Sequence, residues 1–137
     1  MDIISDPAAL LGMMPFAVAS GIELVSAAPA EVVGLLAWTP ERCTAGGILH
    51  GGAVMTLADS VGAVCAFLNL PAGAGTATIE SKTNFFRGVR GGLLRAVARP
   101  LHVGGSTIVV QTDLTNGDDR RVAQVTQTQS VLTARSG

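Results

Sequence analysis

The chain has 137 residues, which is enough for one domain with a single hydrophobic core and too few for two. Hydrophobic residues make up 48% and charged residues 14%, an apolar composition that favours additional burial in an oligomer interface. A net charge of -1 argues against a nucleic-acid-binding surface. Four arginines lie close together in the sequence: Arg87, Arg90, Arg95 and Arg99. They can form a local basic patch or simply mark solvated strand ends, and the sequence leaves both interpretations open.

The cysteines and the charge distribution bear on where the protein works. Cys43 and Cys65 form no CxxC or Cys/His pattern of metal-ligand spacing, so we expect free thiols, a reducing compartment and no metal. No lysine or arginine precedes Arg42, which argues against a signal peptide. Asp59 interrupts the best apolar run, which argues against a membrane span. We therefore expect a cytoplasmic protein with neither a membrane nor a nucleic acid as partner.

The first third of the chain predicts a short helix followed by two strands. Asp6 supplies an N-cap and Pro7 a first helical residue for a helix that ends near Gly12. Pro15 predicts a further turn or a break. The apolar patterns that follow indicate two strands, at 22–26 and 32–38, with a tight connection at 28–30 and a loop from 39 to 49.

The most apolar stretch of the chain follows that loop and predicts one buried helix from Gly51 to Leu68. It has helical length, no proline and no alternating pattern. Its polar residues Thr56, Asp59 and Ser60 are spaced three and four apart, so they share one narrow stripe. The rest of its surface is almost entirely apolar, which is typical of a helix surrounded by other elements.

The second half of the chain alternates in the manner of strands. A Pro/Gly-rich turn leads into the period-two segment TATIESKTNFFR, and glycine pairs or Asn/Gly/Asp turns separate the later strands. The expected strands are 76–87, 93–103, 106–115 and 121–132. The whole chain, 1–137, is thus one α+β domain: a sheet of about six antiparallel strands wrapped round one long central helix, with a short N-terminal helix. Uncovered edge strands would favour pairing of two such sheets.

The strings GGILHGGAVMTLADSVG and TIESKTNFFRGVRGG resemble the hotdog-fold thioesterases. The likeness is to the PaaI-like branch, related to phenylacetate degradation and to 4-hydroxybenzoyl-CoA thioesterase, and it extends from about Pro15 to Leu132. It implies a homodimer with a continuous sheet, commonly paired again into a homotetramer. It also implies hydrolysis of an acyl-CoA thioester without metal or added cofactor, with coenzyme A present only as part of the substrate.

Hydrolysis of a thioester requires a group that stabilises negative charge on the carbonyl oxygen. Backbone N–H groups at the start of a helix are unpaired and point along the helix dipole, and glycine leaves them accessible. The resemblance places this donor at the amide of Gly51, with Gly52 allowing close packing. The alternative is that these glycines only begin the helix.

Asp59 is the candidate base or nucleophile, and the sequence leaves those two roles open. It lies eight residues after Gly51, roughly 12 Å along a straight helix, so one chain cannot bring both groups to one carbonyl. Either Asp59 is an inert member of the polar stripe, or it serves the glycine loop of a neighbouring subunit. The resemblance implies the second, and burial in an apolar helix should raise the pKa of Asp59.

The remaining candidates come mainly from the resemblance. His50 is expected to fix the loop through hydrogen bonds or to lie beside the thioester oxygen, and Thr78 to orient water next to the acid. Thr44 stands where many relatives have Asn or Gln, which puts water positioning or substrate choice in doubt. The predicted substrate and coenzyme A contacts are Gly52, Phe85, Arg87 and Arg90. The two arginines are included because guanidinium groups suit phosphates.

Two other functions fit the same pattern. The hotdog fold also hosts dehydratases and hydratases, but the spacing of Asp followed closely by His is absent here. A non-catalytic protein that only binds acyl-CoA is the second alternative, suggested by Thr44. The acyl group is left open between an aryl-acyl and a medium-chain group.

Overall fold

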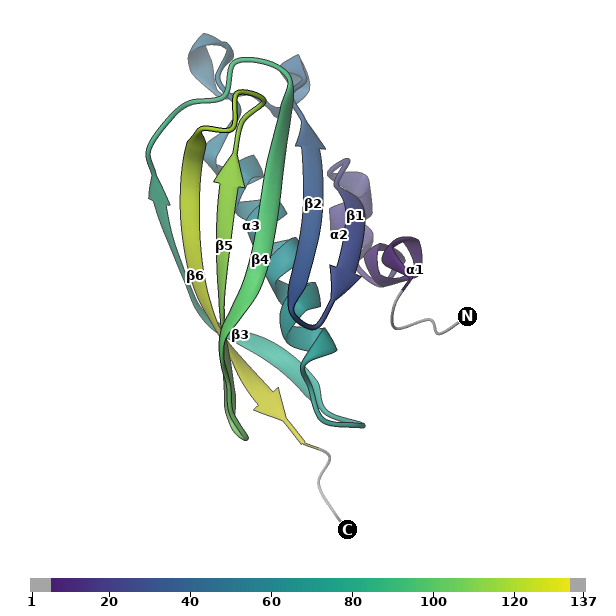
Figure 1. The fold of residues 1–137 in the computed structure, drawn as a ribbon. Coiled ribbons are helices and arrows are strands. Elements are labelled where there is room, and N and C mark those ends of the chain that lie inside the picture. The colour runs from purple at the N-terminus through teal and green to yellow at the C-terminus, as the bar shows by residue number, and fades with distance from the viewer. Residues whose placement is uncertain (1–5, 134–137) are drawn as a thin grey trace.

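The computed structural model describes residues 6–133, which form the predicted α+β architecture (Figure 1). Three α-helices and six strands follow one another within these described residues. Their bounds are α1 Pro7–Gly12, α2 Pro15–Ala19, β1 Glu23–Ala28, β2 Glu31–Ala37, α3 Gly51–Leu68, β3 Gly75–Phe85, β4 Leu93–Val103, β5 Thr107–Thr115 and β6 Arg121–Leu132. The predicted bounds of α3, β4 and β6 agree with the observed ones.

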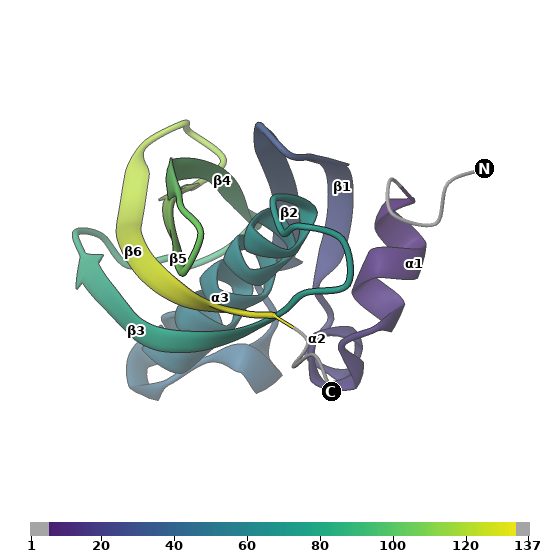
Figure 2. The same ribbon diagram turned by 90° about the horizontal axis from the view of Figure 1, so that it is seen from below.

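The six strands make one antiparallel sheet in the order β1-β2-β4-β5-β6-β3. Figure 2 shows the sheet curling round α3, with α1 outside the curl beside β1; α2 packs against α1 and α3. The order leaves β1 and β3 as the two edges. β3 is one of the longer strands and is exposed along most of its length, so the predicted uncovered edge is present.

Local residue choices explain where the helices begin. The carboxylate of Asp6 accepts a hydrogen bond from the amide of Ala8 at 3.1 Å, and Pro7 occupies the first position of α1. Pro15 similarly begins α2, which the sequence predicted only as a turn or break. The predicted loop before α3 contains two short 3-10 turns, at Pro40–Arg42 and Ala45–Gly47.

The core lies between α3 and the concave face of the sheet. α3 is long and apolar enough to cross a membrane by length and composition, yet half of it is buried inside the domain. Small residues allow the helix to approach closely: a Cβ on Gly34 of β2 would lie 2.5 Å from Cγ2 of Val61. Burial against the sheet therefore explains the apolarity of the half of α3 that faces the core.

Two features of the sheet differ from the sequence prediction. The alternation expected in β3 is broken, because the pairing with β6 shifts register between Thr78 and Glu80 and leaves Ile79 as a bulge. Polar side chains also reach the core face of the sheet: Thr112, Gln127 and Gln129 are fully or almost fully buried. Buried amides in a small core normally serve a hydrogen-bonding purpose.

Candidate active site

One backbone amide at the start of α3 has no hydrogen-bond partner among the described residues. The ring of His50 accepts a hydrogen bond through Nδ1 from the amide of Gly52 at 2.8 Å, and the His50 carbonyl accepts from Ala53 and Val54. No acceptor for the Gly51 amide is found among residues 6–133. This N–H is therefore free for an external acceptor, as an oxyanion donor must be.

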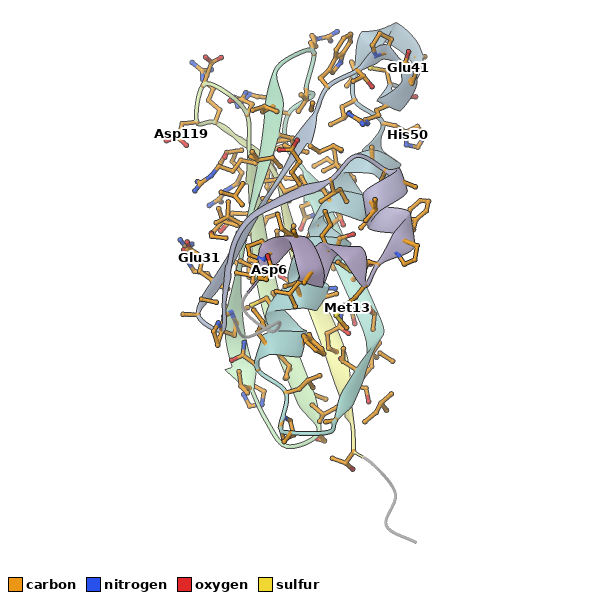
Figure 3. The ribbon with its side chains drawn as sticks, turned by 90° about the vertical axis from the view of Figure 1, so that its right-hand side faces the viewer. Asp6, Met13, Glu31, Glu41, His50 and Asp119 are labelled. Carbon is orange, nitrogen blue, oxygen red and sulfur yellow. The ribbon has the colours of Figure 1, made fainter. Side chains whose placement is uncertain are left out.

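The ring of His50 caps the start of α3, and its expected role in fixing the loop stays a prediction. Figure 3 shows His50 at the same end of the molecule as Glu41. Because Nδ1 accepts a hydrogen bond, a neutral ring of the exposed residue His50 carries its proton on Nε2. A Cβ on Gly52 would lie 2.9 Å from Nδ1, so glycine at this position is needed for the capping geometry.

A hollow of about 370 Å³ opens beside Gly51. Its lining includes Thr44, Gly51, Phe85 and Arg87, so the structure brings four of the predicted site residues together. A Cβ on Gly51 would lie 3.4 Å from the Phe85 ring, an ordinary contact distance. Thr44 is exposed, and its amide donates to the Ile48 carbonyl at 2.8 Å.

A second hollow, of about 400 Å³, lies on the other side of the helix start. His50, Gly52 and Thr56 line it from α3 and the residue before, and Phe16 lines it from α2. Cys43 also borders this hollow, and its thiol donates to the Thr39 carbonyl at 3.3 Å.

Cys65 is buried in the core, which raises its pKa to about 11. Both cysteines are free thiols, as predicted.

Asp59 lies eight residues after Gly51 in α3, so the axial separation is roughly 12 Å. Its side chain keeps an exposed surface in the single protomer, and the Gln127 amide nitrogen donates to Oδ1 at 3.2 Å. Partial burial raises the pKa of Asp59, and the hydrogen bond from Gln127 lowers it by less. The predicted direction of this pKa shift is confirmed.

The polar residues of the stripe on α3 form no hydrogen bonds with one another's side chains among residues 6–133. The Thr56 hydroxyl donates to the Gly52 carbonyl at 2.8 Å, and the Ser60 hydroxyl donates to the Thr56 carbonyl at 2.7 Å. Both hydroxyls thus bond to the backbone of their own helix. Asp59 bonds to β6 instead.

Two neighbouring glutamines of β6 hold the candidate acid and the candidate water-orienting hydroxyl. Gln127 bonds to Asp59, and Gln129 donates to the Thr78 hydroxyl at 2.8 Å. Sequence reasoning missed both glutamines. The signal was available, because period two in β6 places them on the same side as Val125, which is the core side.

The two predicted coenzyme A arginines lie apart. Arg87 lines the hollow beside Gly51. Arg90 lines a different hollow with the turn at 116–118, and its guanidinium donates to the Gly46 carbonyl at 3.4 Å. Gly88 and Val89, the two residues between the arginines, line both hollows, so the two guanidinium groups are placed on either side of this short segment. Residues 6–133 contain no group of three or more His, Cys, Asp or Glu side chains that could hold a metal ion.

Comparison with known proteins places this geometry in a family. The sequence model of the thioesterase superfamily matches residues 46–123, which include the start of α3, Asp59 and Thr78. The chain belongs to the thioesterase superfamily. Within this superfamily it is 36% identical over 95 residues to the Pseudomonas aeruginosa protein PA1618, covering 66% of this chain and 65% of that one. It is also 33% identical over 86 residues to 1,4-dihydroxy-2-naphthoyl-CoA hydrolase of Escherichia coli, covering 63% of each chain.

A solved structure of this superfamily has the same fold. A mutant of the Pseudomonas aeruginosa thioesterase PA1618 superposes with a TM-score of 0.88 at 25% identity, covering 94% of this chain and 95% of that one. The predicted hotdog fold is therefore confirmed. The aligned segments span under two thirds of the length of these two sequence relatives, at 65% and 63%.

Proposed function

We propose that this thioesterase-superfamily member hydrolyses acyl-CoA thioesters to the free acid and coenzyme A. The observation that carries the proposal is the unpaired Gly51 amide at the N-terminus of α3, on the same helix as Asp59, a carboxylate with a raised pKa. Such an amide, reinforced by the helix dipole, suits a carbonyl oxygen that becomes negative during attack. The family match supports thioester cleavage as the general kind of reaction.

The carboxylate of Asp59 drives the attack, either by taking a proton from water or by attacking the carbonyl itself. In both routes the carbon–sulfur bond breaks, the sulfur leaves as the coenzyme A thiol, and water supplies the new oxygen of the acid. A raised pKa makes Asp59 a stronger base than an ordinary aspartate.

The active site is shared between two subunits. Gly51 and Asp59 are separated along one rigid helix by roughly 12 Å, too far for one carbonyl, so each site combines Gly51 of one subunit with Asp59 of the other. Pairing of the exposed edge strand β3 with its copy supplies such a dimer, and two dimers can associate further. Thr78 lies on that strand and orients water beside the acid.

The hollow beside Gly51 binds the coenzyme A part of the substrate. Arg87 meets the phosphates, because its guanidinium provides several donors at a phosphate-sized spacing. Phe85 borders the same hollow and packs on the apolar parts of the cofactor portion. Arg90 contributes less, since it faces the Gly46 carbonyl in a separate hollow.

The acyl group is aryl-acyl or medium-chain. An almost wholly apolar hollow of about 180 Å³ lies further along α3 and is lined by Ala63 and Phe67 of α3 and Met13 beside α1. Met13 is labelled in Figure 3. An apolar lining of this kind suits either group. The E. coli relative acts, by its name, on an aromatic acyl-CoA, which favours the aryl-acyl class and leaves the PaaI-like branch as our prediction.

The first experiment measures release of coenzyme A thiol from a panel of aryl and aliphatic acyl-CoAs. Asp59→Asn should lose at least about a hundredfold in kcat with its circular dichroism spectrum unchanged. Turnover of no substrate in the panel would overturn the hydrolase proposal. Equal activity of Asp59→Asn and the native protein would overturn the role of the acid.

A second experiment tests whether the site is shared. Asp59→Asn and Gly51→Pro chains carrying different tags are co-expressed, and the mixed dimer is purified through both tags. Each parent dimer should be nearly inactive, while the mixed dimer should recover about half of the native activity, because one of its two symmetry-related sites keeps both groups. An inactive mixed dimer would show that each site lies within one chain.

The alternative function, acyl-CoA binding without hydrolysis, rests on Thr44, which stands in the hollow beside Gly51. Its hydroxyl offers one donor, where an amide side chain would offer two. Calorimetric binding of an acyl-CoA without thiol release would favour this alternative. Appearance of thiol release in Thr44→Gln would then assign the missing step to water positioning.

A further inference from the structure

We infer that Gln127 is a positioning residue for Asp59: its buried amide fixes the carboxylate through Oδ1 and leaves Oδ2 for the reaction. This inference rests on the proposed function, in which Asp59 acts on an acyl-CoA. It concerns a residue of β6 that no sequence motif includes, 68 positions away from the acid.

The contact joins the buried amide of Gln127 to the carboxylate of the exposed residue Asp59. Gln127 is 0% exposed, on the core face of β6 between β5 and β3, whereas Asp59 is an exposed residue of α3. The Gln127 nitrogen donates to Oδ1 of Asp59 at 3.2 Å. The amide is therefore held by the core, and its hydrogen bond restricts the rotation of the Asp59 carboxylate.

The fold provides a specific space for this amide. A Cβ on Gly62 would overlap the Gln127 side-chain oxygen, so the glycine in α3 leaves the room that the amide occupies. The same Cβ position lies 3.4 Å from the Thr112 hydroxyl on β5. Three elements, α3, β5 and β6, thus meet around one side chain, and only glycine at position 62 permits the contact.

The arrangement costs stability, which argues against a purely structural role. The Gln127 side-chain oxygen and the Thr112 hydroxyl are buried without a hydrogen-bond partner among residues 6–133. An apolar residue at either position would avoid this cost. Buried polar groups kept at a cost to stability are expected next to a functional site.

Other groups do not account for the orientation of Asp59. Neither ion pair found among residues 6–133 involves Asp59: one joins Arg99 to Glu31, and the other joins Arg121 to Asp113. The hydroxyls of Thr56 and Ser60 bond to helix carbonyls. Gln127 is the one side chain in the described part of the chain that hydrogen-bonds to this carboxylate.

The test replaces Gln127 with methionine, which keeps the length and apolar stem of the side chain and removes the amide. The matched control is Gln124→Met on the outer face of β6, where the Gln124 amide donates to Oδ1 of Asp113 at 2.9 Å. Both changes remove one glutamine–aspartate hydrogen bond from the same strand. Only the first touches Asp59.

The primary readout does not depend on activity. Aspartate carboxyl carbons are labelled with ¹³C and titrated, and the Asp59 signal is identified by its absence in Asp59→Asn. In Gln127→Met, Asp59 should titrate at higher pH, because the hydrogen bond that lowers the pKa of Asp59 is gone. In the hydrolase assay, the acidic limb of the pH–activity profile should shift to higher pH by the same amount as the Asp59 titration. The value of kcat should fall about tenfold, while KM stays within about threefold of the native value.

Gly62→Ala provides a second variant that keeps Gln127 but displaces its amide, and it should shift the Asp59 titration in the same direction. An unchanged Asp59 titration in folded Gln127→Met, or a shift of equal size in Gln124→Met, would overturn the inference. A shifted titration in a protein that hydrolyses no acyl-CoA would leave the contact established and the proposed function refuted. The two failures are therefore distinguishable.

Discussion

Gly51→Pro removes the proposed oxyanion donor without disturbing the helix. Gly51 is the first residue of α3, where proline is well tolerated because its missing N–H would be unpaired in any case. The residue before a proline must be extended, and His50 already has φ -58° and ψ 134°. The backbone on both sides of the change therefore suits proline, and only the hydrogen-bond donor is lost.

The expected effects on activity and stability have opposite signs. Loss of one oxyanion donor typically costs a hundredfold to a thousandfold in kcat, about 3–4 kcal/mol of transition-state stabilisation. Proline at a compatible position restricts the unfolded chain and stabilises a protein by about 0.4–1 kcal/mol. The Phe85 ring, 3.4 Å from a Cβ at this position, can offset part of that gain. We expect the free energy of unfolding to change by less than about 1 kcal/mol while kcat collapses.

Gly51→Ala is the matched control, because it adds the same Cβ and keeps the N–H. Steady-state thiol release gives kcat and KM for both variants, and urea unfolding gives their stability. Gly51→Ala should retain activity within about tenfold of the native protein. Gly51→Pro with near-native kcat would refute the reasoning, and so would an equal loss in both variants, which would point to crowding against Phe85.

Three further predictions concern single side chains. The pKa of Asp59 is higher in the folded than in the unfolded protein. The contribution of Asp59 to stability therefore falls as the pH rises from its pKa in the unfolded chain through its pKa in the folded protein. Asp59→Asn should therefore be more stable than the native protein at pH 7, by under about 1 kcal/mol after solvent screening, and urea unfolding near pH 3 should abolish the difference. Gly52→Ala crowds the His50 ring and should lower both the melting temperature and kcat, whereas Gly12→Ala, with open space around it, should lower neither. Arg87→Ala should raise KM for acyl-CoA about tenfold with little change in kcat, and Arg90→Ala should do so much less; equal effects would contradict the separation of the two arginines.

Local signals made most of the fold predictable. α3 could be delimited because His50-Gly51-Gly52 begins it and the Pro/Gly-rich turn ends it, with uniform apolarity between. The spacing of Gly51 and Asp59 could also be predicted, since both lie on that one helix and its rise per residue is fixed. The sequence therefore placed these two residues correctly relative to each other.

Contacts across the sheet were not predictable from local signals. The bond from Gln127 to Asp59 joins positions 68 apart, and no short-range pattern specifies it. The bulge at Ile79 arises from pairing between β3 and β6, and alternation within β3 alone cannot reveal it. The placement of Arg87 and Arg90 in different hollows involves contacts with Gly46 and with the turn at 116–118, which are distant in the sequence.

The two cysteines have a practical consequence for any assay that counts free thiols. Cys65 is buried in the core, and its raised pKa of about 11 keeps it protonated and unreactive at neutral pH. Cys43 is only half-buried, beside His50, so a thiol-reactive dye can modify the enzyme next to the proposed site while it reports the product. That reaction would release one equivalent of dye per chain. It would also place the dye in the hollow lined by Cys43, His50 and Gly52. Kinetic comparisons are therefore cleaner in a Cys43→Ser background or with a detection method that follows the thioester bond directly.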